Sequence, residues 1–441
     1  MTVLAPPRLR VTTLDITSAV ADETDLLSLV PDVAAPTTLC SWLREGDGLV
    51  AWGRVARCES SGPTRFSDAE SWWQQVCAVA DVVDGVGAPG SGLVTFGSFS
   101  FAGDSGHRSR LVVPEVVIGR REGRVWRTTI EDVGAASSRA DAAGAAQAAP
   151  DPSGPAATVI ARGSVSAQQW PEVIARAISR IAGGEVDKVV LARDELATSP
   201  TPIDVRRVLQ RLVERYDATW TFAVDGLVGA TPEMLVRRWD GTVRSRVLAG
   251  TVRRDTHPAP LVAEDHPDFK DEHHVDPRLR LISSEKDLEE HAYAVRSVSE
   301  ALAPHCRDLV VPEEPFVLKL PDVYHLASDI SGTQADDATS LRLAAALHPS
   351  AAVCGTPARP AAALIAELET MDRGRYAGPV GWMDSAGEGD WGIALRCGEL
   401  CSDPRQMRLF AGGGIVAASD PEAELAETEI KLAAMRYALG G

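Results

Sequence analysis

The sequence predicts a protein of mixed α and β structure. Strand-like stretches such as residues 49–56 and 92–101 alternate along the chain with stretches of helical periodicity such as residues 168–181. The chain has 441 residues, of which 45% are hydrophobic, so it can bury an extended core. This length suits two or three ordinary domains or one large α/β domain, and it does not decide between them.

The chain divides into two unequal portions. Residues 1–133 contain the two strands named above and a helical stretch around residues 69–83, but no group of catalytic residues, and we interpret this portion as scaffold. Residues 134–157 are mostly alanine, serine and proline, which is typical of a linker or a long surface loop. Residues 158–441 hold every segment that points to chemistry.

The second portion begins with a helix and a strand. The helical pattern at 168–181 leads through two glycines into a strand at 186–196. Alternation along this strand places Lys188, Val190 and Ala192 on one face.

Three further segments follow. Residues 281–303 have the pattern of a helix with a serine start and apolar residues at 288, 292 and 295. Residues 377–397 are predicted to form a hairpin around a turn of Gly, Asp and Ser. Residues 219–239 are predicted to be a series of strands, interrupted at Gly226, Gly229 and Pro232.

Charge and hydropathy restrict the partners. The formal net charge of -18 argues against nucleic acid or an anionic membrane surface, because both are bound through clustered Lys and Arg. No basic and apolar leader is visible at the N-terminus, and no stretch approaches the roughly twenty apolar residues of a membrane helix. We therefore expect a soluble, cytoplasmic protein. Seven cysteines, an odd number without a CxxC pair, predict neither a disulfide framework nor a zinc site.

The most informative segment is the glycine-rich run at 411–431, AGGGIVAASDPEAELAETEIK. Glycines at positions 412, 413 and 414 let the backbone approach a ligand and offer its N–H groups. The sequence Ser-Asp-Pro at 419–421 then predicts the start of a helix.

On that helix, Glu424, Glu427 and Lys431 share one face. A solvated, salt-bridged surface is the more usual explanation of such a face when the segment is taken alone. However, Asp287 and Glu290 show the same spacing on the helix at 281–303. If the two acidic faces confront each other, their carboxylates supply what Mg²⁺ takes from a protein, and zinc is disfavoured because only a histidine lies beside them.

Two further side chains are candidates for proton transfer. Lys188 lies within an apolar strand, so it either extends to solvent or occupies a polar cavity, and a lysine of lowered pKa can act as a general base. Glu233 follows Pro232 at a bend between strands and is either a matching acid or an exposed loop residue.

Cations and a histidine complete the candidate site. Arg396, placed in a strand, suits a bidentate contact with a carboxylate, and Lys431 adds a second positive charge. Arg396 can also be the partner of a structural acid. His325 is either a hydrogen-bond donor in the pocket or a satisfied core histidine.

Taken together, these segments resemble the chorismate-utilising enzymes, the family of isochorismate, salicylate, anthranilate and aminodeoxychorismate synthases. The resemblance runs from about residue 159 to 439, roughly two-thirds of the chain, whereas in the N-terminal third only SWLREGDGLVAWG (41–53) is similar to isochorismate synthases. The motifs are KVVLAR (188–193), GATPEML (229–235), LAGT (248–251), SEKDLEEH (284–291), HLASDISG (325–332), HPSAAVCGTP (348–357), RGRYAGPVGWMD (373–384), WGIALR (391–396) and the glycine-rich run.

The resemblance implies one large α/β (α+β) fold over residues 1–441, with two stacked antiparallel sheets and helices outside, as in the large subunits of anthranilate synthases. It also implies a Mg²⁺-dependent site for chorismate. Carried over by position, Glu290 and Glu427 match the metal ligands, with Asp287 and Glu424 in support. Lys188 matches the general base and Glu233 the general acid that protonates the departing C4 hydroxyl. The matching substrate-binding positions are Ala249, Gly250, Thr251, His325, Ala352, Tyr376, Arg396, Gly412, Gly413, Gly414 and Lys431.

Two positions favour water as the nucleophile. Members that add ammonia typically carry glutamine at the position of Lys188, and one type of aminodeoxychorismate synthase carries lysine at the position of Ala249. The resemblance therefore implies an isochorismate synthase, which reversibly adds water at C2 of chorismate with loss of the C4 hydroxyl. An amidotransferase subunit is then not expected. Nothing in the sequence demands a partner subunit, so we expect a monomer.

Other readings stay open. Salicylate synthases share Lys188, Glu233 and the metal site, and then eliminate pyruvate; Ala352 favours isochorismate synthase, because lyase-competent members tend to carry threonine there. Anthranilate synthase is disfavoured by LAGTVRR at 248–254, which departs from the usual LAGTRPR. A binding protein without turnover has no need of the Lys188 and Glu233 pair. The sequence leaves open whether the product feeds menaquinone or a siderophore.

Overall fold

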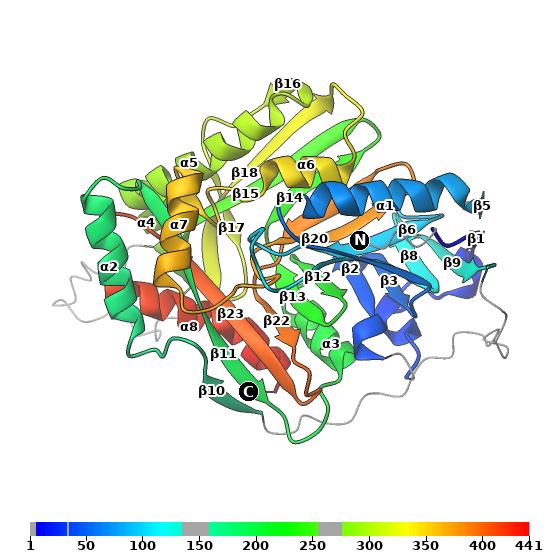
Figure 1. Ribbon diagram of the computed structural model, residues 1–441, viewed down its shortest axis with the longest axis horizontal. Helices are drawn as coiled ribbons and strands as arrows, with labels where there is room; N and C mark the ends of the chain where they lie inside the picture. The colour runs from blue at the N-terminus through cyan, green and yellow to red at the C-terminus, as the bar shows by residue number, and fades with distance from the viewer. Residues whose placement is uncertain (1–5, 33–34, 135–157, 255–275, 441) are drawn as a thin grey trace, which may run out of the picture.

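The computed structural model describes residues 6–32, 35–134, 158–254 and 276–440. Within these ranges the chain forms two large sheets with helices on their outer faces (Figure 1). The predicted mixed α/β fold with two stacked, largely antiparallel sheets is confirmed. The linker predicted at 134–157 lies, apart from Gly134, outside the described residues.

The first sheet has 13 strands among the described residues. In this sheet β1 and β5 pair in parallel, and all the other described pairs of neighbouring strands are antiparallel. The order across this sheet is β10 (Val159–Arg162), β11 (Lys188–Thr198), β23 (Gln406–Ile415), β22 (Cys397–Leu400), β13 (Leu227–Thr231), β12 (Trp220–Val224), β2 (Cys40–Arg44), β3 (Asp47–Trp52), β8 (Val116–Arg121), β9 (Arg124–Asp132), β1 (Leu9–Asp15) and β5 (Asp81–Asp84), with β19 (Gly355–Thr356) paired to β11.

The second sheet has 10 strands in the described part of the chain, all paired antiparallel. Its order is β16 (Cys306–Val310), β18 (Val323–Gln334), β15 (Thr242–Arg253), β14 (Met234–Trp239), β21 (Gly389–Ile393), β20 (Pro379–Asp384), β6 (Val94–Ser98), β7 (Ser109–Val113) and β4 (Ala56–Ser60), with β17 (Phe316–Lys319) paired to β18. Each sheet thus combines strands from residues 1–133 with strands from residues 158–441.

Helices cover the outer face of each sheet (Figure 1). Against the first sheet lie α2 (Trp170–Ala182), α3 (Val205–Arg215), α7 (Ala358–Leu368) and α8 (Pro421–Ala438). Against the second lie α1 (Arg65–Val79), α4 (Pro277–Ser283), α5 (Glu285–Leu302) and α6 (Ser340–Leu347). Three short 3₁₀ helices, η1 (Thr17–Ala19), η2 (Leu26–Leu29) and η3 (Pro36–Thr38), connect the N-terminal strands.

The core lies between the sheets. Strands β12, β13, β20 and β21 are buried at every position, because both of their faces are covered. Such strands carry continuous apolar runs in place of a strict alternation. Polar contacts also cross the interface; for example, Trp42 Nε1 on β2 donates to Asp390 Oδ2 on β21 at 3.1 Å.

The helix with a serine start that was predicted within 281–303 is confirmed as α5, but its first residues were assigned wrongly, because 281–283 belong to α4. Ser284 separates α4 from α5 and caps α5, because its side chain accepts a hydrogen bond from Asp287 N at 3.2 Å. The apolar face was also assigned wrongly. The buried residues of α5 are His291, Ala294, Val298 and Leu302. His291, whose ring is hydrogen-bonded to Ser328 at 2.9 Å, is polar, so the buried face does not show as a continuous apolar pattern in the sequence.

Two smaller predictions were wrong in part. The helix expected around 69–83 is α1, which ends at Val79, and residues 81–84 form the edge strand β5. Gly229 does not interrupt a strand but lies inside β13, where a Cβ would meet the backbone of Arg396 and Cys397. The strand breaks at Gly226 and Pro232 and the hairpin of β20 and β21 are confirmed.

None of the helices that the structure describes is both long enough and apolar enough to cross a membrane. The seven cysteines are free, and five of them are buried.

Candidate active site

A cavity of ≈ 80 Å³ lies where β11 and β23 of the first sheet meet β15 and β18 of the second. The predicted site residues that line it are Glu233, Ala249, Gly250, Thr251, Glu290, His325, Ala352, Tyr376, Arg396, Gly412, Gly413, Gly414, Glu427 and Lys431. A neighbouring cavity of ≈ 440 Å³ shares Thr251, Glu290, Gly414, Glu427 and Lys431 with it and adds Asp287 and Glu424. Lys188 joins the group through its contact with Glu290. The fold thus gathers all of these residues in one region.

The glycine-rich strand is β23, and its missing side chains leave room for carboxylates. A Cβ at Gly413 would lie 3.1 Å from Glu424 Oε2, and a Cβ at Gly414 would clash with Glu290 Oε1. The strand therefore lets α5 and α8 bring their acids directly against its backbone. The predicted start of α8 is confirmed, since Asp420 accepts a hydrogen bond from Ala423 N at 2.9 Å.

The acidic faces of α5 and α8 do confront each other across the second cavity. Three lysines are paired with three of the glutamates: Lys188 Nζ lies 3.0 Å from Glu290 Oε1, Lys286 Nζ 3.1 Å from Glu424 Oε1, and Lys431 Nζ 2.5 Å from Glu427 Oε1. In this lysine-paired arrangement, no three acidic, histidine or cysteine side chains among the described residues are close enough together to enclose a metal ion.

One carboxylate oxygen is left over. Glu424 Oε2 is buried and has no hydrogen-bond partner within the described ranges. Burial raises the pKa of Glu424 to about 7, and the neighbouring negative charge of Glu427 adds to the effect. A cation would relieve both penalties. An all-oxygen set on two facing helices therefore fits Mg²⁺, which typically takes one or two carboxylates and completes its shell with water or substrate oxygens.

Lys188, the first residue of β11, is completely buried and does not extend to solvent. Its ammonium group forms the ion pair with Glu290 at the edge of the cavity. The polar cavity, the less common alternative for a lysine in an apolar strand, is what the structure shows.

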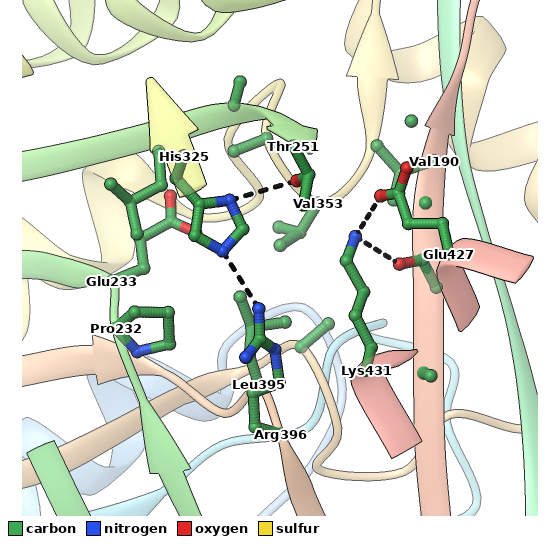
Figure 2. Close-up of a pocket in the computed structure, with 18 of the residues that line it drawn as sticks. Val190, Pro232, Glu233, Thr251, His325, Val353, Leu395, Arg396, Glu427 and Lys431 are labelled. Atoms are coloured by element: carbon green, nitrogen blue, oxygen red, sulfur yellow. Dashed lines mark hydrogen bonds and ion pairs between the residues drawn. The ribbon is translucent and has the colours of Figure 1, made fainter. Parts of the chain in front are cut away.

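Glu233 lies between β13 and β14 and is 5% exposed, so it is not a solvated loop residue. Burial raises the pKa of its carboxyl group to about 8, although the positive charges of Lys188 and Lys431 and the Leu248 N–H act in the opposite direction. At neutral pH the carboxyl group of Glu233 is therefore protonated in most of the molecules. Figure 2 shows Glu233 and His325 on one side of the cavity and Lys431 with Glu427 on the other.

Arg396 is not in a strand, which corrects the prediction. It connects β21 to β22 in a left-handed conformation with φ 48°. Arg396 Nη2 donates to His325 Nε2 at 2.9 Å (Figure 2), so the imidazole proton is on Nδ1, which faces Thr251 Oγ1 at 3.0 Å. Burial and the charge of Arg396 keep the pKa of His325 well below its usual range, and the ring is neutral.

The charge of Arg396 has no acidic partner among the described residues, although the side chain is only 8% exposed. A buried guanidinium without a counterion favours an anionic ligand. Lys431 adds a second cation, and it also donates to Gly412 O at 2.9 Å. Tyr376 forms part of the wall and stacks on Phe410, with ring centroids 5.0 Å apart.

A β-bulge in β15 brings α5 close. Strand pairing with β18 shifts between Ala249 and Thr251, and Gly250 has φ 78°. A Cβ at Gly250 would lie 3.0 Å from Asp287 Cβ, so a side chain here would push α5 outward.

The sequence did not single out one charged pair beside the cavity. Arg373 lines the cavity wall and donates to Val353 O at 2.9 Å, to Val190 O at 2.7 Å and to both oxygens of Glu369. The signal was present in RGRYAG at 373–378, where two arginines flank a glycine.

Comparison with known proteins decides the family. The model of the chorismate binding enzymes matches residues 9–440. The chain belongs to this family. The isochorismate synthase DhbC of Bacillus subtilis is 41% identical over 285 residues, which cover 62% of this chain and 68% of that protein.

Two further members of the chorismate binding enzyme family are similar over nearly the whole chain. A salicylate biosynthesis isochorismate synthase of Pseudomonas aeruginosa is 34% identical over 426 residues, covering 90% of this chain and 84% of that protein. The solved structure of MenF, the menaquinone-specific isochorismate synthase of Escherichia coli, is 25% identical and superimposes with a TM-score of 0.74, covering 99% of this chain and 95% of that chain. The resemblance inferred from the sequence motifs is thus confirmed at the level of the family and the fold.

Proposed function

We propose that the protein is an isochorismate synthase, which converts chorismate reversibly to isochorismate. The observation that carries the proposal is a pair of buried titratable side chains at one cavity: Glu233, whose pKa is raised by burial, lines the cavity, and Lys188 forms an ion pair with Glu290 at its edge. The names of the relatives support the same activity.

Together with the neighbouring cavity of ≈ 440 Å³, with which it shares five residues, the cavity offers room for a dicarboxylate such as chorismate. Arg396, whose charge has no acidic partner in the described part of the chain, would bind one carboxylate through two N–H groups. Tyr376, Lys431 and the backbone of Gly412–Gly414 line the same space, and His325 holds the Arg396 guanidinium in position. Orientation of the ring between these groups places its C2 and C4 positions for proton transfer.

Glu290 and Glu427 would hold Mg²⁺, with Asp287 and Glu424 supporting them from the same cavity. When bound, the ion would supply positive charge next to a substrate carboxylate and so stabilise negative charge that develops in the reaction. In the structure these two glutamates are paired with Lys188 and Lys431, and the same carboxylates would hold the ion.

Two proton transfers then follow from the residues present. Lys188 Nζ takes a proton from the water that attacks C2, as the ring double bonds shift. Glu233 gives its proton to the hydroxyl that leaves C4, which departs as water. One water enters and one leaves, so substrate and product have the same mass and the reaction is close to balanced. The reverse reaction exchanges the roles of the two residues.

Water is the nucleophile in this proposal, and no glutamine-amidotransferase subunit is needed. The competing activity is that of a salicylate synthase, which would remove pyruvate from bound isochorismate. Ala352 lines the cavity where lyase-competent members tend to carry threonine, and the isochorismate synthase is the reading that we favour.

The test is incubation of the purified protein with chorismate and Mg²⁺ in the absence of ammonia, followed by chromatography and mass spectrometry. A product of unchanged mass and new retention time, which reaches the same plateau from either side, supports the proposal. Salicylate with pyruvate would assign the bifunctional reaction instead. Turnover only after addition of ammonia would contradict the role given to Lys188.

A further inference from the structure

A further cavity, which we call the α1–α6 cavity, lies outside the site described above. It has a volume of ≈ 860 Å³ and lies between α1, α6 and the loop that follows β6. This volume is within the range of small-molecule sites, roughly 300–1,000 Å³. No residue is shared between its lining and that of the active-site cavity.

The walls of the α1–α6 cavity are largely apolar and aromatic. Phe66 and Phe101 contribute rings, and the ring of His348 packs edge-on against Phe101 with centroids 5.6 Å apart. His348 Nε2 donates to Phe101 O at 2.9 Å, and burial holds the pKa of His348 at about 3, so the ring is neutral and acts as one more flat surface. Such walls favour a planar, aromatic ligand.

A buried cation lies at one end. Arg65, at the start of α1, is 7% exposed and lines the cavity. Three of its five N–H groups donate to the carbonyl oxygens of Ser100, Phe101 and Gly62, and no acidic side chain among the described residues pairs with it. Two N–H groups of the guanidinium are left to bind a ligand. The guanidinium also lies over the Phe66 ring, 4.6 Å from its centroid.

The other charges around the cavity do not cancel Arg65. Arg342 and Glu70 form an ion pair at 3.2 Å, and Glu70 also accepts a hydrogen bond from Thr339. Asp104 is exposed, so solvent screens its charge. Arg65 is thus buried without a paired carboxylate among the described residues, and the charge of Asp104 acts on it only in the weakened form that solvent screening leaves. The first turn of α1 adds backbone N–H groups, because Thr64 makes no side-chain cap.

We propose that this cavity binds an aromatic carboxylate, with the ring beside Phe66, Phe101 and His348 and the carboxylate at Arg65, and that its occupation changes the affinity of the active site.

A single side chain, Phe101, connects this cavity to Arg373, which lines the active-site cavity. The ring of Phe101 lies against the Arg373 guanidinium, 4.3 Å from the ring centroid, and Phe101 N donates to Gly374 O at 2.9 Å. Arg373 in turn holds the carbonyl groups of Val190 and Val353, which line the active-site cavity. A ligand that reorients Phe101 must move these contacts, and by linkage a substrate in the active site alters the binding of that ligand by the same factor.

Benzoate is the probe, and benzamide is its uncharged counterpart. Binding to the full-length protein is measured by calorimetry at constant ionic strength. Ala345→Trp fills the cavity from α6, whereas Ala346→Trp places the same side chain on the exposed side of that helix and is the matched control. Neither residue lines the active-site cavity.

Benzoate is expected to bind the wild type with a dissociation constant of roughly 1 mM or tighter, as suits a ligand of this size. We expect Ala345→Trp to weaken binding at least about tenfold, Ala346→Trp to leave it unchanged, and benzamide to bind about tenfold less well than benzoate, because it lacks the charge that meets Arg65. Equal affinity of benzoate for Ala345→Trp and wild type, or equal affinity of benzoate and benzamide, would overturn the proposal.

The coupling has its own readout. Saturating benzoate should change the dissociation constant of chorismate in the wild type and in Ala346→Trp, but not in Ala345→Trp. A purely competitive effect that persists in Ala345→Trp would place benzoate in the active site and overturn the assignment. This test measures the binding of benzoate and chorismate, so its outcome does not depend on which product the active site makes.

Discussion

The buried carboxyl group of Glu233 leads to a prediction that links stability to chemistry. Burial raises the pKa of this group from an ordinary 4.5 to about 8 in the folded protein. A group with a raised pKa contributes stability that is fully present below its unfolded pKa and is lost as the pH rises through its folded pKa. Glu233 should therefore weaken the folded protein progressively between about pH 5 and pH 8.

Replacement of Glu233 by glutamine removes this dependence and keeps the shape of the side chain. One pKa unit corresponds to about 1.4 kcal/mol, so the variant should exceed the wild type in free energy of unfolding by about 3 kcal/mol at pH 7 and about 5 kcal/mol above pH 8. At pH 4 the two proteins should be equally stable, as far as this site is concerned. The same variant should lose about 10²- to 10⁴-fold in turnover, the usual contribution of a general acid.

Urea unfolding followed by tryptophan fluorescence, at a series of pH values, measures the difference. Glu399→Gln is the control. Burial alone would raise the pKa of Glu399, but the charge and hydrogen bond of Arg375 outweigh burial and lower it. The stability contributed by Glu399 is present above its unfolded pKa and is lost as the pH falls, so Glu399→Gln should be less stable than the wild type at neutral pH. A stability difference between Glu233→Gln and wild type that stays flat over the whole series would refute our account of Glu233.

Three further substitutions test the surroundings of the cavity. Arg396→Lys keeps the charge but loses the two-pronged contact, and should raise KM for chorismate by about 10- to 100-fold with an unchanged urea midpoint; an unchanged KM would remove Arg396 from substrate binding. Gly414→Ala places a Cβ against Glu290 Oε1, and should raise the Mg²⁺ concentration needed for half-maximal activity, whereas an unaltered Mg²⁺ titration would contradict the proposed ligand. Arg373→Met strands the buried Glu369 carboxylate and should cost about 3–5 kcal/mol in urea unfolding, most of it recovered when Glu369→Gln is added; no recovery in the double variant would show that the pair is not the cause.

Local signals account for what the sequence predicted well. Consecutive glycines before Ser-Asp-Pro specify both β23 and the start of α8, because each depends on a few neighbouring residues. Matched acidic spacings on two helices predicted that Glu290 and Glu427 would come together, since helical periodicity fixes which residues share a face.

What the sequence could not predict depends on distant contacts. The ion pair of Lys188 with Glu290 joins residues about a hundred positions apart, and the raised pKa of Glu233 results from burial by both sheets. The left-handed backbone at Arg396 is set by the junction of β21 with β22, and strand propensity does not reveal it.

The central claim is that water attacks chorismate with Lys188 as base and Glu233 as acid. The most direct test is to run the reaction in H₂¹⁸O with Mg²⁺ and without ammonia, and to locate the label in the product by mass spectrometry. The account predicts labelled oxygen in the new hydroxyl group at C2, with incorporation abolished in Lys188→Ala. Isochorismate without label, or incorporation by Lys188→Ala at the wild-type rate, would contradict it.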